Sequence, residues 1–232
     1  MSQYKLCLHH ELMLLILDDS KGKFTGGMYT LGLAGAALSE LLLQGIIKVS
    51  DDDKKIVEVV ASKEVNDPIL DEIVQKIVES KKPQELKYWV SAVSSTKNLN
   101  HRVAQQLCDL EILRYDESIV LWFFTSKRYP EVDGSYEDAI RKRMASVMFK
   151  PEVKTDERTA VLICFAKASG VLDANFAKVE LTQHKKNIDE ICEGNQLAAG
   201  ATTEALVAVQ AAMTVAALAA TIAATAAATA AT

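Results

Sequence analysis

The feature of the sequence that most constrains its fold is a helical segment followed by two β-branched runs around a charged turn. Residues 30–45 are rich in Ala and Leu, their apolar side chains recur at helical spacing, and Gly45 stands where a helix would stop. Two β-branched runs follow at 46–50 and 56–61, separated by the charged residues 51–55 (DDDKK). Runs of this kind around a polar turn are typical of a β-hairpin. The segment therefore predicts a helix that leads into a two-stranded wing.

The same order of elements returns later in the chain. Residues 98–113 (NLNHRVAQQLCDLEIL) predict a second helix. Residues 113–125 then predict a strand, a polar turn at 115–118 and another strand. A winged-helix-like unit is therefore expected twice, as a weak internal repeat of architecture and not as the stacked array of a solenoid.

Helical periodicity dominates the rest of the sequence. A chain of 232 residues with 49% hydrophobic residues can bury one sizeable core without disulfides or metals. Trp89 and Trp122 lie in apolar runs and are expected in that core. Further helices are expected at 10–19, at 66–82 behind an Asn-Asp-Pro start, at 83–95 from Pro83, at 135–149, at 155–176 behind a cap at Thr155, and at 183–196. The predicted fold is mainly α: a single globular helical domain with several β-hairpins over residues 1–200.

The last segment of the chain, residues 201–232, has a different composition. From Ala205 to Thr232 there is no charged residue, and residues 223–232 are only Ala and Thr. A helix packed on the domain or on a partner is the first interpretation, and a frayed tail is the second. A membrane anchor is the third, because Ala is a weak anchor and flanking Lys, Arg, Trp and Tyr are missing.

The charge pattern argues against nucleic acid as a partner. The formal net charge is −5, and both expected hairpin turns are acidic on balance, at 51–55 and 115–118. Nucleic-acid binding usually requires a basic surface. Basic residues do gather locally, at Lys127 with Arg128 and at 141–143 (RKR).

The motifs of catalysis and metal binding are missing from the sequence. It contains no phosphate-binding loop, nucleophile elbow, dinucleotide fingerprint or zinc-protease motif, so we expect no catalytic residues and no enzyme. The four cysteines form no C-x-x-C pair and are expected to be reduced. The adjacent histidines His9 and His10 would point to different faces of a helix, so they would not chelate a metal unaided. Neither a metal nor a cofactor is expected. No signal peptide is apparent either, which predicts a cytoplasmic protein.

Three stretches together resemble the Golgi phosphoprotein 3 family. They are residues 12–24 (LMLLILDDSKGKF) followed by 32–47 (GLAGAALSELLLQGII), residues 97–113 (KNLNHRVAQQLCDLEIL), and residues 156–176 (DERTAVLICFAKASGVLDANF). Their order and spacing hold from about residue 8 to residue 196, which is most of the chain. The resemblance implies a mainly α-helical domain with several hairpins, which agrees with the pattern above.

The family's eukaryotic members are adaptors on the Golgi membrane, which bind phosphatidylinositol 4-phosphate and the cytosolic tails of membrane proteins. Carried over to this sequence, the resemblance places Lys97 and Arg102 at basic positions of the lipid pocket and Tyr29 near its aromatic position. Asn100 and Ala34 stand where the family has basic residues. These departures suggest a bacterial or otherwise divergent member.

We therefore expect a non-catalytic module that lies peripherally on membranes, at the Golgi if the source is eukaryotic. Its partners would be anionic phospholipid headgroups and cytosolic tails of membrane proteins, and a homo-oligomer is compatible with the sequence. The expected lipid-binding residues are Lys97, Arg102, Tyr29, Arg141 and Arg143. The plainer interpretation of these charges is that they solvate helix faces. The alternative function is a winged-helix-like scaffold that binds protein or nucleic acid.

Overall fold

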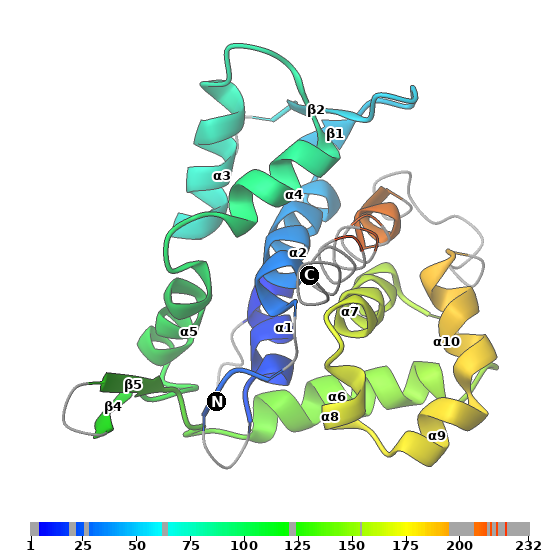
Figure 1. The fold of residues 1–232 in the computed structure, drawn as a ribbon. Coiled ribbons are helices and arrows are strands. Elements are labelled where there is room, and N and C mark those ends of the chain that lie inside the picture. The colour runs from blue at the N-terminus through cyan, green and yellow to red at the C-terminus, as the bar shows by residue number, and fades with distance from the viewer. Residues whose placement is uncertain are drawn as a thin grey trace, which may run out of the picture.

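The computed structural model (Figure 1) describes residues 5–18, 22–25, 28–61, 65–120, 124–153, 155–194 and 207–212, with Thr214, Ala217 and Thr221. Helices α1 (Leu8–Ile16) and α2 (Tyr29–Leu43) run through the middle of the molecule. Helices α3 to α5 lie along one side of this pair and α6 to α10 along the other. Every residue of α1 and residues 31–42 of α2 are buried, so this pair is the centre of the core.

Helix α2 packs closely because its central residues are small. A Cβ atom on Gly32 would lie 1.9 Å from Ser169 Oγ, just after helix α7 (Glu157–Ala168). Ala34, Ala36 and Ala37 are also fully buried. Small side chains let helix backbones approach each other, so the Gly- and Ala-rich run of α2 places α7 directly against it. At the end of α2, Gly45 has a φ of +66°, as the predicted helix stop requires.

The first predicted hairpin is confirmed. Strands β1 (Ile47–Val49) and β2 (Ile56–Val59) pair antiparallel around the charged residues 51–55. A third short strand, β3 (Gln84–Glu85), pairs with the other edge of β2. The prediction that a helix starts at Pro83 is therefore wrong, because the free edge of β2 takes up Gln84 and Glu85 first and α4 (Leu86–Ser94) begins after them.

The second hairpin is confirmed as an element, but its predicted turn is wrong. Helix α5 (Leu99–Asp109) precedes strands β4 (Asp116–Val120) and β5 (Phe124–Arg128). Asp116 pairs with Arg128, and Glu117 pairs with Lys127. Opposite charges directly across two strands stabilise the pairing. Residues 116–118 are therefore part of strand β4, and Tyr115 directly precedes it. The ladder extends to the pair Val120 and Phe124, and residues 121–123, which include Trp122, fall outside the described residues.

Two helix starts show how the local sequence sets an element boundary. Helix α3 (Pro68–Val78) begins as predicted, with Asp67 Oδ1 accepting the Ile69 and Leu70 N–H groups at 2.9 Å. Helix α7 is capped by Asp156, which accepts the Thr159 N–H at 2.9 Å. The cap predicted at Thr155 is therefore one residue too early.

The other side of the molecule consists of short helices. These are α6 (Ser135–Met148), α8 (Leu172–Asn175), α9 (Lys178–Gln183) and α10 (Lys185–Cys192). The single helix predicted over 155–176 is divided into α7 and α8, because the chain turns at Gly170 with a φ of +70°.

The described part of the C-terminal segment packs on the domain. Residues 207–212 are helical, and all of them except Gln210 are buried. Ser39 of α2 donates a hydrogen bond to the Ala208 carbonyl. Within the part of the chain that the structure describes, no helix has the length and apolar character needed to cross a bilayer.

Candidate functional site

Five aromatic and imidazole side chains from separate segments meet at one end of the molecule. Phe24 stacks on Tyr29 with ring centroids 5.4 Å apart and lies 5.3 Å from His101 and 5.9 Å from Tyr129. Tyr115 lies 5.7 Å from Tyr129. We call these five residues the aromatic face. It joins the start of α2, the start of α5 and the base of the β4–β5 hairpin.

The loop before α2 places Phe24 by a close backbone approach. Gly22 has a φ of +58°, and its carbonyl accepts the Tyr129 N–H at 2.8 Å. A Cβ on Gly22 would lie 2.3 Å from Pro130 N and 2.4 Å from Tyr129 C. Only glycine fits this position, so the loop can lie directly on the hairpin base. Thr25 fixes the other end of the loop, because its N–H and hydroxyl both donate to Ile16 O.

Burial disfavours a charge on two polar groups of the aromatic face, His101 and Tyr129. His101 Nδ1 and the Tyr129 hydroxyl are hydrogen-bonded at 2.9 Å. Partial burial, together with the nearby Lys127 ammonium, lowers the pKa of His101. Burial, with the neighbouring Tyr115 as a smaller cause, raises the pKa of Tyr129 to about 12. Positive charge therefore comes from the lysines around the face and not from His101.

The predicted lipid-binding residues fall into two groups. Tyr29 belongs to the aromatic face, and Lys97 is exposed in the turn before α5, on which His101 also lies. Arg102 is on α5 too, but its guanidinium pairs with Glu72 of α3 at 2.6 Å. Tyr29 is therefore connected to α5 through Phe24, which also contacts His101, and the role of these residues in lipid binding stays a prediction.

Arg141 and Arg143 are on α6 and have partners inside the protein. Arg143 pairs with Glu11 of α1 at 2.9 Å. Arg141 pairs with Glu137 and donates to Asn175 Oδ1 at 3.0 Å. Arg141 also lines a pocket of about 220 Å³, which it shares with Thr25. Their role in lipid binding stays a prediction, and the structure gives both of them a role in packing α6 against the core.

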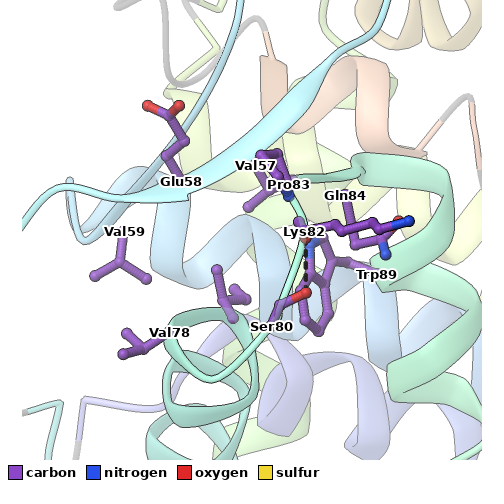
Figure 2. A pocket seen from close by; sticks show the side chains of 10 residues that line it. Val57, Glu58, Val59, Val78, Ser80, Lys82, Pro83, Gln84 and Trp89 are labelled. Atoms are coloured by element: carbon purple, nitrogen blue, oxygen red, sulfur yellow. Dashed lines mark hydrogen bonds between the residues drawn. The ribbon is translucent and has the colours of Figure 1, made fainter.

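A separate groove lies beside Trp89, which the structure buries as predicted. Its volume is about 370 Å³, and it is bounded by β2, the end of α3 and the segment that leads into α4 (Figure 2). Val57, Val59 and Pro83 line it, and Ser80 closes the turn beside it with a hydrogen bond to Lys82 O at 2.8 Å. The groove combines apolar walls with an exposed lysine, but it shares no lining residue with the aromatic face.

Comparison with known proteins decides the family. Residues 8–209 match the family model described as Golgi phosphoprotein 3 (GPP34). This chain belongs to the Golgi phosphoprotein 3 family. It is also similar to vacuolar protein sorting-associated protein 74 of Schizosaccharomyces pombe, with 25% identity in an alignment of 232 positions that covers 84% of this chain and 68% of that relative. The resemblance found in the sequence is therefore confirmed.

The departures of this chain from the Golgi phosphoprotein 3 pattern now have a structural setting. Ala34, in place of the expected arginine, is fully buried in α2. The sequence pattern did not identify Phe24, Tyr115, His101 and Tyr129 as residues of this site. The signal for the two tyrosines was present, because they directly flank the paired residues Asp116 and Arg128 and so meet at the hairpin base.

Proposed function

We propose that this chain is a non-catalytic peripheral membrane adaptor that binds anionic phospholipid headgroups with its aromatic face. The observation that carries the proposal is the meeting of Phe24, Tyr29 and His101 beside Lys97, in a member of the Golgi phosphoprotein 3 family. Tyrosine rings suit the boundary between water and lipid, because they combine an apolar body with a polar end.

The lysines supply the attraction to phosphate. Lys97 and Lys127 are both exposed, and Lys127 is close enough to His101 to influence its pKa. Each basic residue near an anionic membrane contributes about 1 kcal/mol. The two exposed lysines therefore support weak binding to anionic lipid, and the aromatic side chains of the face would make contact with the headgroup.

Arg102 is expected to contribute less than Lys97. Its guanidinium already pairs with Glu72, which also pairs with Lys76 at 2.7 Å. A phosphate group would have to replace Glu72 as the partner of Arg102, and the attraction gained would be offset by the ion pair lost.

Co-sedimentation with liposomes tests the proposal. The full chain is mixed with vesicles of phosphatidylcholine alone, with added phosphatidylserine, or with added phosphatidylinositol 4-phosphate, each at low and moderate salt. The variant Lys97→Ala/Lys127→Ala should lose most of the binding. The charge-matched control Lys178→Ala/Lys186→Ala changes two exposed lysines on α9 and α10 and should bind like the wild type.

The three vesicle types separate the outcomes. Selective binding to the phosphoinositide would support a specific pocket, and binding to either anionic vesicle that salt abolishes would support a general electrostatic surface. If neither anionic vesicle carries the protein down, or if both double variants bind equally, the proposed lipid function is wrong.

A further inference from the structure

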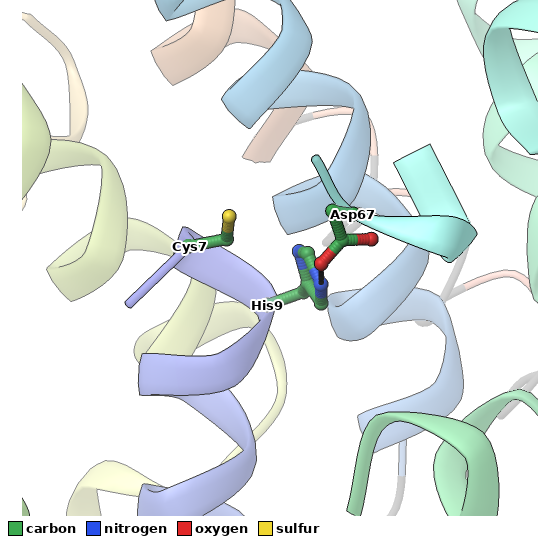
Figure 3. A group of neighbouring side chains, drawn as sticks. All are labelled: Cys7, His9 and Asp67. Carbon is green, nitrogen blue, oxygen red and sulfur yellow. Dashed lines mark hydrogen bonds and ion pairs between the residues drawn. The ribbon is translucent and has the colours of Figure 1, made fainter. Parts of the chain in front are cut away.

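Three potential metal ligands meet at the start of α1. Cys7 precedes the helix, His9 is its second residue, and Asp67 caps α3 from far along the chain (Figure 3). One ligand atom from each of the three lies within 4.8 Å of the others. His9 is fully buried, Asp67 is 4% exposed, and Cys7 is half-buried. A sulfur, an imidazole and a carboxylate therefore share one largely buried space.

The two oxygens of Asp67 have separate tasks. Oδ1 accepts the N–H groups at the start of α3. Oδ2 faces the histidines, with His9 Nε2 at 3.2 Å and His10 Nε2 at 3.6 Å, and it accepts a hydrogen bond from Gln106. A ligand at Oδ2 would therefore leave the cap of α3 intact.

Hydrogen bonds satisfy only one of the two ring nitrogens of His9 within the described residues. Its Nδ1 atom is buried and has no hydrogen-bond partner among the described residues. A buried polar atom without a partner destabilises the fold and needs an explanation, for which an ion is one of the usual candidates.

We propose that Cys7, His9 and Asp67 bind one divalent transition-metal ion of the zinc type, in a structural site that ties the start of α1 to the start of α3. Thiolate, imidazole and carboxylate are the ligands that zinc takes in proteins. With metal–ligand bonds of about 2.0–2.3 Å, ligand atoms at the corners of a tetrahedron lie about 3.5 Å apart. One ligand atom from each of Cys7, His9 and Asp67 lies within 4.8 Å of the others, so the three atoms already come close to this spacing.

The remaining adjustment is small. Cys7 lies outside the first turn of α1, so rotation of its side chain can bring the sulfur about 1 Å closer to the other ligands. On binding, the Cys7 S–H bond breaks, the sulfur forms a bond with the metal, and the proton passes to solvent. The ion needs no change in its oxidation state.

The charges around the site favour a cation. Asp67 contributes one carboxylate to the site itself, and the carboxylates of Glu40 and Glu11 also act on the Cys7 thiol. Arg158 pairs with Glu40 and approaches Glu11, so it compensates part of this negative charge. A cation bound at the site would balance the remainder.

Cobalt titration tests the site. The full chain is purified, treated with a chelator and titrated with Co²⁺, whose bond to a thiolate gives a charge-transfer band in the near ultraviolet. We expect one equivalent of Co²⁺ with this band, displacement by Zn²⁺, and a higher Tm with Zn²⁺ than with chelator. The variant Cys7→Ala should lose the band and bind at least ten-fold more weakly. The control Cys108→Ala changes another half-buried thiol, which lies outside the cluster. It should keep both the charge-transfer band and the affinity of the wild type.

A second variant separates binding from folding. Asp67→Asn keeps a good helix cap but removes the carboxylate charge, so it should fold with unchanged far-ultraviolet circular dichroism and bind Co²⁺ at least ten-fold more weakly. The proposal is overturned if the wild type gives no charge-transfer band. It is equally overturned if Cys7→Ala binds as tightly as the wild type, or if the band disappears in Cys108→Ala instead.

Discussion

At the scale of single residues, one arginine holds three elements together. Arg158 of α7 pairs with Glu40 of α2 at 3.0 Å, approaches Glu11 of α1 at 3.6 Å, and donates to the Leu6 carbonyl. Burial alone would raise the pKa of Glu40, but Arg158 and the N–H of Leu8 outweigh it, and the net effect lowers that pKa. The Glu40 carboxylate is nearly inaccessible to solvent, so its charge depends on this guanidinium.

Arg158→Ala should therefore destabilise the protein strongly. Removal of one partner from a buried ion pair leaves an uncompensated charge and typically costs about 3–5 kcal/mol. Urea unfolding at pH 7 measures the change. The control is Arg114→Ala, because Arg114 forms only an exposed pair with Asp116 and should change stability little. Equal effects of the two variants would contradict the assigned role of Arg158.

The same residue predicts a dependence on pH. The pKa of Glu40 is lower in the folded protein than in the unfolded chain. Its contribution to stability is therefore fully present above the unfolded pKa of about 4.3 and is lost as the pH falls through the folded pKa. We expect the stability difference between wild type and Arg158→Ala to shrink below about pH 4. Unfolding curves across this range check it, and a difference that grew towards acid would contradict it.

At the scale of elements, the sequence predicted which segments are helices better than where they meet. The start of α3 and the stop of α2 at Gly45 follow from local chemistry, namely a proline with a capping Asp and a glycine with positive φ. Strand β3 could not be found locally, because Gln84 and Glu85 are extended only through their pairing with β2. The turn of the second hairpin was misplaced because its charge pairs were taken for a turn.

In the candidate site, too, the sequence identified residues by their local pattern but not the contacts between distant segments. Lys97 and Tyr29 were identified through the family pattern. The structure places Tyr29 at the start of α2 and Lys97 just before the start of α5. His101 was not identified, because nothing adjacent in the sequence shows that Phe24 and Tyr129 pack on it. The grouping of Cys7 with Asp67 likewise depends on how α1 and α3 are arranged, which no spacing in the sequence encodes.

The contact between α2 and α7 can be tested by filling it. Gly32→Ala would place a methyl group against the Ser169 hydroxyl and should destabilise the protein by about 1–3 kcal/mol through overpacking. The double variant Gly32→Ala/Ser169→Ala should recover much of this loss. Ser169 Oγ has no hydrogen-bond partner among the described residues, so its removal costs little. Chemical unfolding of both single variants and the double variant gives the coupling, and purely additive effects would show that the two residues do not meet.

At the scale of the whole molecule, the α1–α2 pair is the body on which the other parts are arranged. The aromatic face lies at the start of α2, and the proposed metal ligands lie at the start of α1. Residues 207–212 contact α2 at Ser39. Family similarity extends to residue 209, beyond the boundary at residue 200 expected from composition. Residues 207–212 are therefore packed on the domain despite the low-complexity composition of the last segment.

This arrangement predicts that the beginning of the C-terminal helix stabilises the domain. Ala208 is fully buried and its carbonyl accepts the Ser39 hydroxyl, whereas Gln210 on the same helical segment is exposed. Ala208→Asp buries an unpaired carboxylate and should cost at least about 2 kcal/mol. Gln210→Asp introduces the same charge in water and should be nearly neutral, so thermal unfolding of the two variants compares burial at constant charge. Identical unfolding of both with the wild type would mean that this helix does not contribute to the stability of the core. A loss confined to Ala208→Asp would mean that the Ala-rich segment, despite its composition, begins as a structural helix of the domain.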